Sequence, residues 1–177
     1  MTATQTSTWT IDQAHSTVNF SLRHMMVTKV TGQFERFSGT IVFDPANVDA
    51  ASVEVEIETA SITTRSADRD THLRSADFFD AETYPTITFK STGVHGHGDS
   101  FHVHGDLTMH GVTREVVLDT TFNGTGTSPF GHTVAGFEAE TKIKRGDFGL
   151  NWNAALETGG VMVSDEIRIT LDIEATQ

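Results

Sequence analysis

Histidine is the residue type in this sequence that most invites a chemical interpretation, because it occurs nine times. Four copies, His95, His97, His102 and His104, alternate on either side of a predicted turn at 98–100. If a hairpin forms there, the four imidazoles share one face and could bind zinc, copper or nickel. Apolar residues hold the opposite parity, so we expect this face to point to solvent, without the buried partners that orient metal ligands. A metal-binding protein stays an alternative, and we assign no metal site.

Other catalytic signatures are missing from the sequence. There is no G-x-S-x-G elbow, H-E-x-x-H pair, Walker loop or dinucleotide-binding glycine motif. There is also no cysteine, which excludes thiol nucleophiles, thiolate metal sites and disulfides. We therefore assign no catalytic residue. The enzymatic alternative is a site for a hydrophobic substrate, with His24 or His72 beside a carboxylate.

The elements that would position any site are strands, because about eight segments alternate apolar and polar residues with a period of two. This alternation gives each strand one apolar and one polar face, and a sheet of such strands must close or fold over to bury the apolar face. We predict an all-β fold, an eight-stranded antiparallel barrel, as one domain over residues 1–177. The predicted strands are 9–24, 33–44, 52–63, 86–95, 101–109, 114–123, 132–144 and 164–175.

Two segments break the alternation and are long enough to cover an end of the barrel. The first contains a predicted short helix that starts at Ser66, a plausible N-cap, and runs to Arg74. The second is the glycine-containing stretch 145–163.

The charge balance excludes one class of partner. The chain carries 24 acidic and 12 basic residues, a formal charge of −12, with no basic stripe. Such a surface repels phosphates, so we expect no nucleic-acid binding. No apolar run is long enough for a membrane-spanning helix, and no secretory signal is visible, so we expect a cytoplasmic protein without stable membrane insertion.

The interior is the better place to look for function. Twelve phenylalanines stand against one tyrosine and two tryptophans, which favours apolar surface without polar groups. An eight-stranded barrel can either fill with its own side chains or hold one slim ligand. Composition and parity leave both possibilities open.

The motifs along the chain resemble those of the YceI family, the lipocalin-like polyisoprenoid-binding proteins. The resemblance spans nearly the whole chain in the right order. The segments that carry it are WTIDQAHSTVNF at 9–20 with His24, GQF at 32–34, FSGTI at 37–41, RDTHL at 69–73, DFF at 77–79, Tyr84-Pro85, GDLTMHGVT at 105–113, DFG at 147–149 and VSDEI at 163–167.

The resemblance implies a lipocalin-like barrel with a helix at its mouth and an interior pore that holds a long isoprenoid, an isoprenoid quinone or a similar amphiphilic lipid. It also implies a possible homodimer. No other cofactor is expected. We expect a headgroup to meet His24, Arg65, Asp70 or His72 at one end. The residues predicted to bind the ligand, all but His24 by lining or closing the pore, are Phe20, His24, Phe34, Ile41, Val55, Ile57, Leu73, Phe78, Phe89, Leu107, Phe122, Phe137, Phe148 and Leu171.

Overall fold

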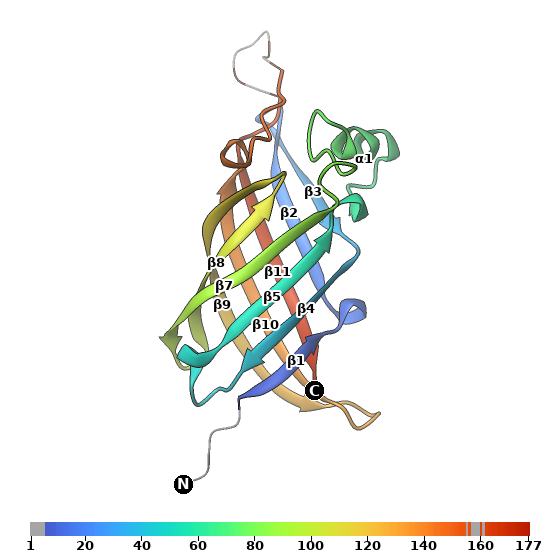
Figure 1. The fold of residues 1–177 in the computed structure, drawn as a ribbon. Coiled ribbons are helices and arrows are strands. Elements are labelled where there is room, and N and C mark those ends of the chain that lie inside the picture. Colours follow the sequence, from blue (N-terminus) through green and yellow to red (C-terminus); the bar gives the residue numbers. More distant parts are fainter. Residues whose placement is uncertain (1–5, 155, 157–159, 161) are drawn as a thin grey trace.

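A single antiparallel sheet closes on itself to form the barrel in Figure 1. The computed structural model describes residues 6–154, 156, 160 and 162–177. Within them, β1 pairs with both β4 and β11, which closes a ring of eight strands. The ring strands are β1 (Ser7–Ile11), β4 (Phe37–Phe43), β5 (Ser52–Glu58), β7 (Thr86–His97), β8 (Ser100–Met109), β9 (Val112–Thr127), β10 (Thr133–Lys144) and β11 (Glu166–Thr176).

Three further strands, β2 (Thr17–His24), β3 (Thr28–Phe34) and β6 (Ile62–Thr63), extend the barrel upward in Figure 1. They continue β1, β4 and β5 across short interruptions, so each pair is one long bent strand. The interruptions are two short 3-10 helices, η1 (Gln13–His15) and η3 (Thr59–Ser61), and the dipeptide 35–36. Counted this way, the eight predicted segments correspond to eight strands joined in sequence order, and the prediction of an eight-stranded antiparallel barrel is confirmed.

Two strands differ most from their predicted bounds, and both were predicted too short. The second strand begins at Thr28 rather than at residue 33, although Gly32 weakens its pattern. Gly32 fits because it pairs with Phe20, whose ring lies where a side chain at Gly32 would stand. Strand β9 runs from Val112 to Thr127 rather than from 114 to 123, because its glycine-rich end still pairs with β10. Local turn signals were overridden there by pairing between strands.

Helix α1 (Ala67–Arg74) confirms the predicted short helix. The Ser66 hydroxyl caps it by accepting a hydrogen bond from the Arg69 amide at 3.4 Å. Two more single turns, η2 (Val48–Ala50) and η4 (Arg145–Phe148), lie between strands. Among the described residues, no helix has the length and apolar character needed to cross a membrane.

Alternation along the strands separates a dry interior from a charged exterior. On β8, Phe101, Val103 and Leu107 are buried, whereas His102 and Asp106 are exposed. Outside, ion pairs join neighbouring strands, for example Lys90 to Glu54 at 3.5 Å and Lys142 to Glu166 at 3.6 Å. The interior of the barrel therefore consists almost wholly of apolar side chains.

Candidate functional site

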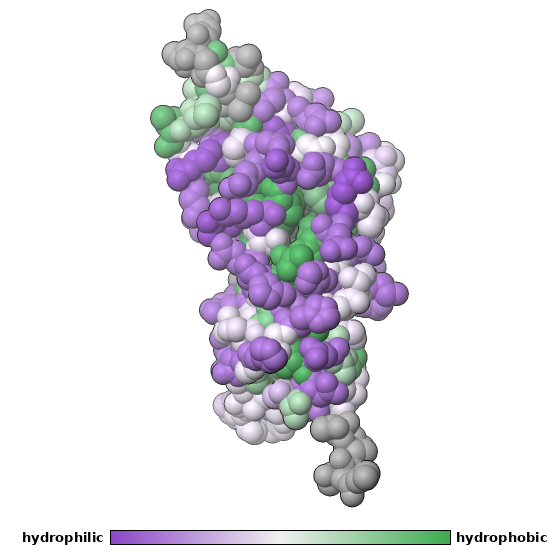
Figure 2. All heavy atoms as spheres, turned by 90° about the vertical axis from the view of Figure 1, so that its left-hand side faces the viewer, coloured by the Kyte–Doolittle hydropathy of each residue, from purple (hydrophilic) through white to green (hydrophobic). Residues whose placement is uncertain are grey.

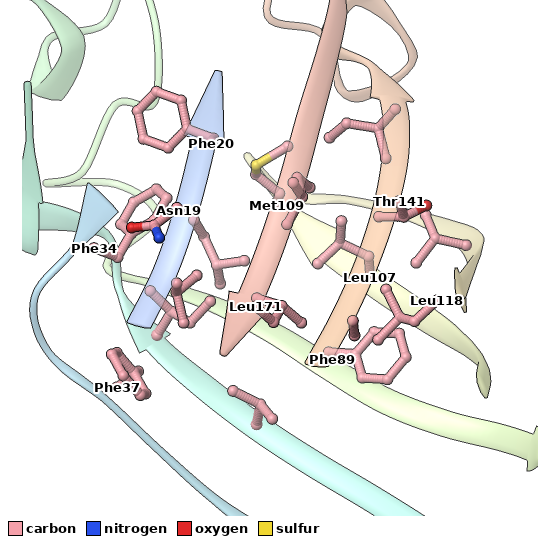
Figure 3. A pocket seen from close by; sticks show the side chains of 18 of the residues that line it. Asn19, Phe20, Phe34, Phe37, Phe89, Leu107, Met109, Leu118, Thr141 and Leu171 are labelled. Atoms are coloured by element: carbon pink, nitrogen blue, oxygen red, sulfur yellow. The ribbon is translucent and has the colours of Figure 1, made fainter. Parts of the chain in front are cut away.

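The barrel encloses a cavity of about 230 Å³. A single buried water needs only about 10–15 Å³ on the same scale, so the cavity is too large to be a packing defect. The surface that faces it is apolar. Figure 3 shows phenylalanines, leucines and Met109 from both sides of the barrel pointing into it. The barrel is therefore hollow along part of its length.

Phenylalanines close the cavity at the end of the barrel where the termini lie. The ring of Phe43 contacts those of Phe101, Phe122 and Phe137, with centroids 5.8, 4.9 and 5.1 Å apart. Phe122 and Phe137 also contact each other at 5.4 Å. Phe43 and Phe137 line the cavity, whereas Phe101 and Phe122 lie behind them. This cluster is the floor of the cavity, because tilted and edge-on aromatic pairs fill space efficiently.

The opposite end, the mouth, is covered by two segments, which are α1 with the loop after it and the described residues 145–154 and 162–163. Leu73 and Phe78 from the first segment, and Leu150 and Val163 from the second, line the cavity. The segments meet through Trp152, whose indole lies 4.9 Å from the His72 ring and 5.2 Å from the Phe78 ring. The mouth is thus covered by side chains from both segments.

A second opening lies in the wall of the barrel, between β9 and β10. The ladder between these strands runs from Thr133 and Thr127 to Glu140 and Asp119, and stops there. Above this point, β9 pairs only with β8, and β10 only with β11. Val116 and Leu118 line the cavity on the open edge of β9 and are only half-buried. Figure 2 shows this face, with apolar residues at the bottom of an opening flanked by polar ones.

We call this opening the side window. Its lower edge is the last ladder position, formed by Asp119 and Glu140. Above it, the tip of the β8–β9 hairpin contacts η4, where the Nδ1 atom of His110 lies 3.0 Å from the Phe148 carbonyl oxygen. The window therefore interrupts the wall without breaking the barrel apart.

Arg145, on η4, is the charged residue that lines the cavity. It is 6% exposed, and burial lowers the pKa of its guanidinium, an effect that nearby Asp165 opposes. Its N–H groups donate to the carbonyl oxygens of Leu150 and Trp152 at 2.6 and 2.9 Å and of Ser164 at 2.9 Å. Arg145 thus fastens the segment that covers the mouth.

Eleven of the fourteen predicted ligand-binding residues line the cavity, whereas their role in ligand binding stays a prediction. The eleven are Phe20, Phe34, Ile41, Val55, Ile57, Leu73, Phe78, Phe89, Leu107, Phe137 and Leu171. They come from eight strands and from the α1 segment, so closure of the barrel brings together residues far apart in the sequence.

The other three do not line the cavity. Phe122 lies in the floor. Phe148 is 1% exposed and packs in the core near the β8–β9 hairpin tip. His24 is the last residue of β2 and forms an isolated bridge with Val163. It therefore lies at the outer edge of the mouth and not in the cavity lining.

The four residues expected to meet a headgroup do not line the cavity either. The buried carboxylate of Asp70 accepts hydrogen bonds from the Thr64 amide at 2.8 Å and hydroxyl at 2.6 Å, which is a structural role. The imidazole of His72 lies 2.9 Å from the Asp77 carboxylate and is held between aromatic rings. Arg65 has a left-handed backbone with φ of 64° at the start of the α1 segment. The enzymatic alternative therefore has a His–Asp pair at the mouth, but not one that faces the cavity.

The histidine hairpin forms as predicted, with the histidines on the outer face. His95 pairs with His102, and the rings of His95 and His104 lie 5.5 Å apart. The Nε2 atom of His102 lies 3.0 Å from the Asp119 carboxylate on β9, and the Nδ1 atom of His104 lies 3.7 Å from the Glu115 carboxylate on the same strand.

Among the described residues, one group of three donors has its atoms within 4.8 Å of one another, and it lies elsewhere, at Asp12, His15 and Glu174. It is an acidic surface cluster in which the imidazole of His15 is hydrogen-bonded to Asp12.

Sequence reasoning missed two kinds of lining residue. Val116, Leu118, Ile167 and Ile169 have the inward parity of their strands, so the alternation itself could have identified them. Arg145 carried no such signal, because an arginine beside Gly146 in a loop is expected to be solvated.

Known proteins resemble this chain in sequence. The YceI-like domain profile matches residues 9–175. The chain is 44% identical over 138 residues to a UPF0312 protein of Vibrio cholerae, covering 77% of this chain and 73% of that protein. It is 42% identical over 163 residues to Protein YceI of Escherichia coli O157:H7, covering 92% and 82%.

Solved structures share the fold. BcnA of Burkholderia cenocepacia superposes with a TM-score of 0.82 at 28% identity, covering 93% of this chain and 98% of that one. The YCEI protein of Campylobacter jejuni gives 0.76 at 32% identity, covering 88% and 89%. A polyisoprenoid binding domain from Saccharophagus degradans gives 0.68 at 18% identity, covering 97% and 99%.

Proposed function

Because this chain belongs to the YceI-like domain family, we propose that it is a non-catalytic lipid carrier whose barrel holds a polyisoprenoid, an isoprenoid quinone or a similar amphiphile. The observation that carries the proposal is the apolar cavity of about 230 Å³. The Saccharophagus degradans structure of the same fold, described as a polyisoprenoid binding domain, supports this class of ligand.

Burial alone can account for binding. Each methylene removed from water contributes about 0.8 kcal/mol, so a long hydrocarbon chain needs few polar contacts. The cavity matches this requirement, because its facing surface is apolar. A catalytic site would need polar groups directed at the ligand, and the His72–Asp77 pair lies outside the cavity lining. Binding is therefore the better interpretation.

The shape of the site gives the ligand a direction. The phenylalanine floor closes one end, so the hydrocarbon tail lies toward Phe43 and Phe137, and the polar end lies toward the mouth and the side window. Arg114 is next to that window. It pairs with the cavity-lining Leu107, so its side chain is on the interior face of β9, yet it is exposed because β10 has diverged.

Arg114 is the better candidate for headgroup contact. Arg145 already donates to several carbonyl oxygens, whereas among the described residues no ion pair involves Arg114. A guanidinium binds phosphate and carboxylate oxygens well and also donates to carbonyl oxygens. We therefore place a hydrogen-bond-accepting or anionic headgroup at Arg114.

The test is lipid extraction from protein purified without detergent, followed by mass spectrometry. We expect a stoichiometric amphiphile in the wild type and a strongly reduced amount in Ala139→Trp, which fills the cavity without burying a charge. Glu138→Trp is the matched control, because Glu138 is the neighbouring outward-facing residue of β10. An empty wild-type protein that also shows no saturable uptake of an isoprenoid would overturn the proposal. Equal loading of both variants would place the ligand outside the cavity.

A further inference from the structure

The tip of the β2–β3 hairpin exposes large apolar side chains. Met25, Met26 and Val27 are 45%, 63% and 76% exposed. Among the residues that the structure describes, the one other exposed large apolar side chain is Phe130. It belongs to the loop between β9 and β10, which lies at the far end of the barrel in Figure 1. Adjacent exposed apolar residues on a soluble surface commonly mark an interaction site.

The backbone conformation of this tip does not favour the residue types found there. Met25 and Met26 both have left-handed backbones, with φ of 52° and 63°, and the Val27 amide donates to the His24 carbonyl oxygen at 3.2 Å. Two consecutive positive φ angles in a hairpin turn favour asparagine and glycine, because the β-carbon of other residues then crowds the backbone. Two methionines in this turn therefore cost stability and expose apolar surface at the same time.

The residue pair just below the tip is unfavourable as well. Arg23 and Lys29 are exposed and lie directly opposite each other across the hairpin. Like charges at opposed positions destabilise a strand pair. The stretch from Thr17 to Phe34 contains no acidic residue, although the whole chain has a net charge of −12. The apolar tip thus lies above a hairpin that carries cationic and no acidic side chains.

The tip belongs to the mouth of the cavity. The Met25 amide donates to the Met162 carbonyl oxygen at 2.8 Å, and His24 pairs with Val163, which lines the cavity. In Figure 1 the β2–β3 hairpin stands at the same end of the barrel as α1 and η4 with the described residues that follow it. A partner bound at this tip therefore lies next to the covered end of the cavity.

From these observations we propose that the β2–β3 hairpin docks the mouth of the barrel on an anionic lipid bilayer. Met25, Met26 and Val27 enter the interface, while Arg23 and Lys29 contact lipid phosphates, the combination by which amphipathic surfaces bind anionic membranes. The biological role of this docking rests on the proposed function, because a lipid carrier must exchange its cargo with a bilayer. The binding itself does not require a filled cavity.

Co-sedimentation with vesicles tests the docking. Wild-type protein is expected to sediment with vesicles of phosphatidylcholine mixed with phosphatidylglycerol, much less with phosphatidylcholine alone, and less as salt increases. Arg23→Gln combined with Lys29→Gln should weaken binding about thirtyfold, the loss expected for two cations at an anionic surface. Met26→Ser combined with Val27→Ser should weaken binding at least as strongly.

Phe130→Ser is the matched control, since it removes an 87% exposed apolar side chain from the far end. It should leave vesicle binding unchanged. Far-ultraviolet circular dichroism and thermal unfolding of each variant show whether the barrel still folds. The proposal is overturned if the wild type does not sediment with anionic vesicles, or if Phe130→Ser weakens binding as much as the tip variants. It is also overturned if sedimentation velocity shows that the tip instead joins two copies of the chain.

The lipid content of the same samples separates the two proposals. Protein that carries an amphiphile but ignores vesicles overturns the docking alone. Protein that binds anionic vesicles through the tip but has an empty cavity that takes up no isoprenoid overturns the carrier function alone.

Discussion

Asp119 of β9 and Glu140 of β10 form the last paired position of the ladder between these strands. Both strands continue beyond this position, to Val112 and to Lys144, but they pair there only with their outer neighbours. The wall of the barrel is therefore open just where Val116 and Leu118 line the cavity. A ligand held in the cavity, as proposed, would thus have a passage through the wall as well as the covered mouth.

Closing the side window should slow exchange of the ligand. The chain has no cysteine, so Val117→Cys with Lys142→Cys gives a unique pair for a bismaleimide that bridges the window. We expect cross-linking to slow uptake of a fluorescent isoprenoid about tenfold or more, as closure of a gating element does.

The control for this cross-link is the pair Thr121→Cys with Glu138→Cys, because these positions are already partners in the ladder. Cross-linking there should leave the rate unchanged. If instead Trp152→Ala accelerates uptake and the window cross-link has no effect, the ligand passes through the mouth, where Trp152 contacts His72.

Replacing Arg114 should change which headgroup is retained. We expect Arg114→Leu to bind an isoprenoid phosphate or carboxylate about tenfold more weakly, because one charge-assisted hydrogen bond contributes about 1.5–3 kcal/mol. A neutral hydrocarbon of the same length should bind as before. Lys144→Leu removes an exposed cation from β10 and serves as the control. Equal losses for the charged and neutral ligands would show that Arg114 acts on the fold rather than on the headgroup.

Arg145 should matter for stability. Arg145→Met removes the donors that hold the carbonyl groups of Leu150, Trp152 and Ser164, and we expect a loss of about 3 kcal/mol in the free energy of unfolding. Lys144→Met, at an exposed neighbouring position, should change it by less than about 0.5 kcal/mol. Urea denaturation measures both. A loss for Arg145→Met no larger than that of the control would contradict the assigned role.

The surface pair of His15 and Asp12 predicts a pH dependence. The hydrogen bond to Asp12 raises the pKa of His15 from 6.5, and the same bond lowers the pKa of Asp12 from 3.8. The stabilisation from His15 is complete below pH 6.5 and is lost as pH rises through its raised pKa. The stabilisation from Asp12 is complete above pH 3.8 and is lost as pH falls through its lowered pKa.

Wild type should therefore exceed His15→Gln in stability most clearly between about pH 4 and 6.5, and the two should converge at alkaline pH. Denaturant midpoints measured across this range check the expectation. A stability difference between wild type and His15→Gln that grows at alkaline pH would contradict a raised pKa of His15.

The fold and most of the cavity lining follow from alternation in the sequence. In β5, the inward residues Val53, Val55 and Ile57 are separated by glutamates, and all three line the cavity. Side chains on neighbouring positions of a strand point to opposite faces, so parity assigns each residue to the interior or the exterior without any knowledge of its neighbours. The short helix could also be predicted from local sequence, because its start is set by the Ser66 cap.

Tertiary structure alone decided where along the barrel each inward residue lies. Phe122 and Phe137 are both inward-facing and are paired on β9 and β10, yet Phe137 lines the cavity and Phe122 lies in the floor behind it. The side window is likewise invisible in the sequence, because Val116 and Leu118 of β9 and Thr141 and Ile143 of β10 keep their inward positions alongside it. Ladder ends, bulges and the position of Arg145 depend on register between strands that are distant in the chain. A period of two in one strand carries no information about that register.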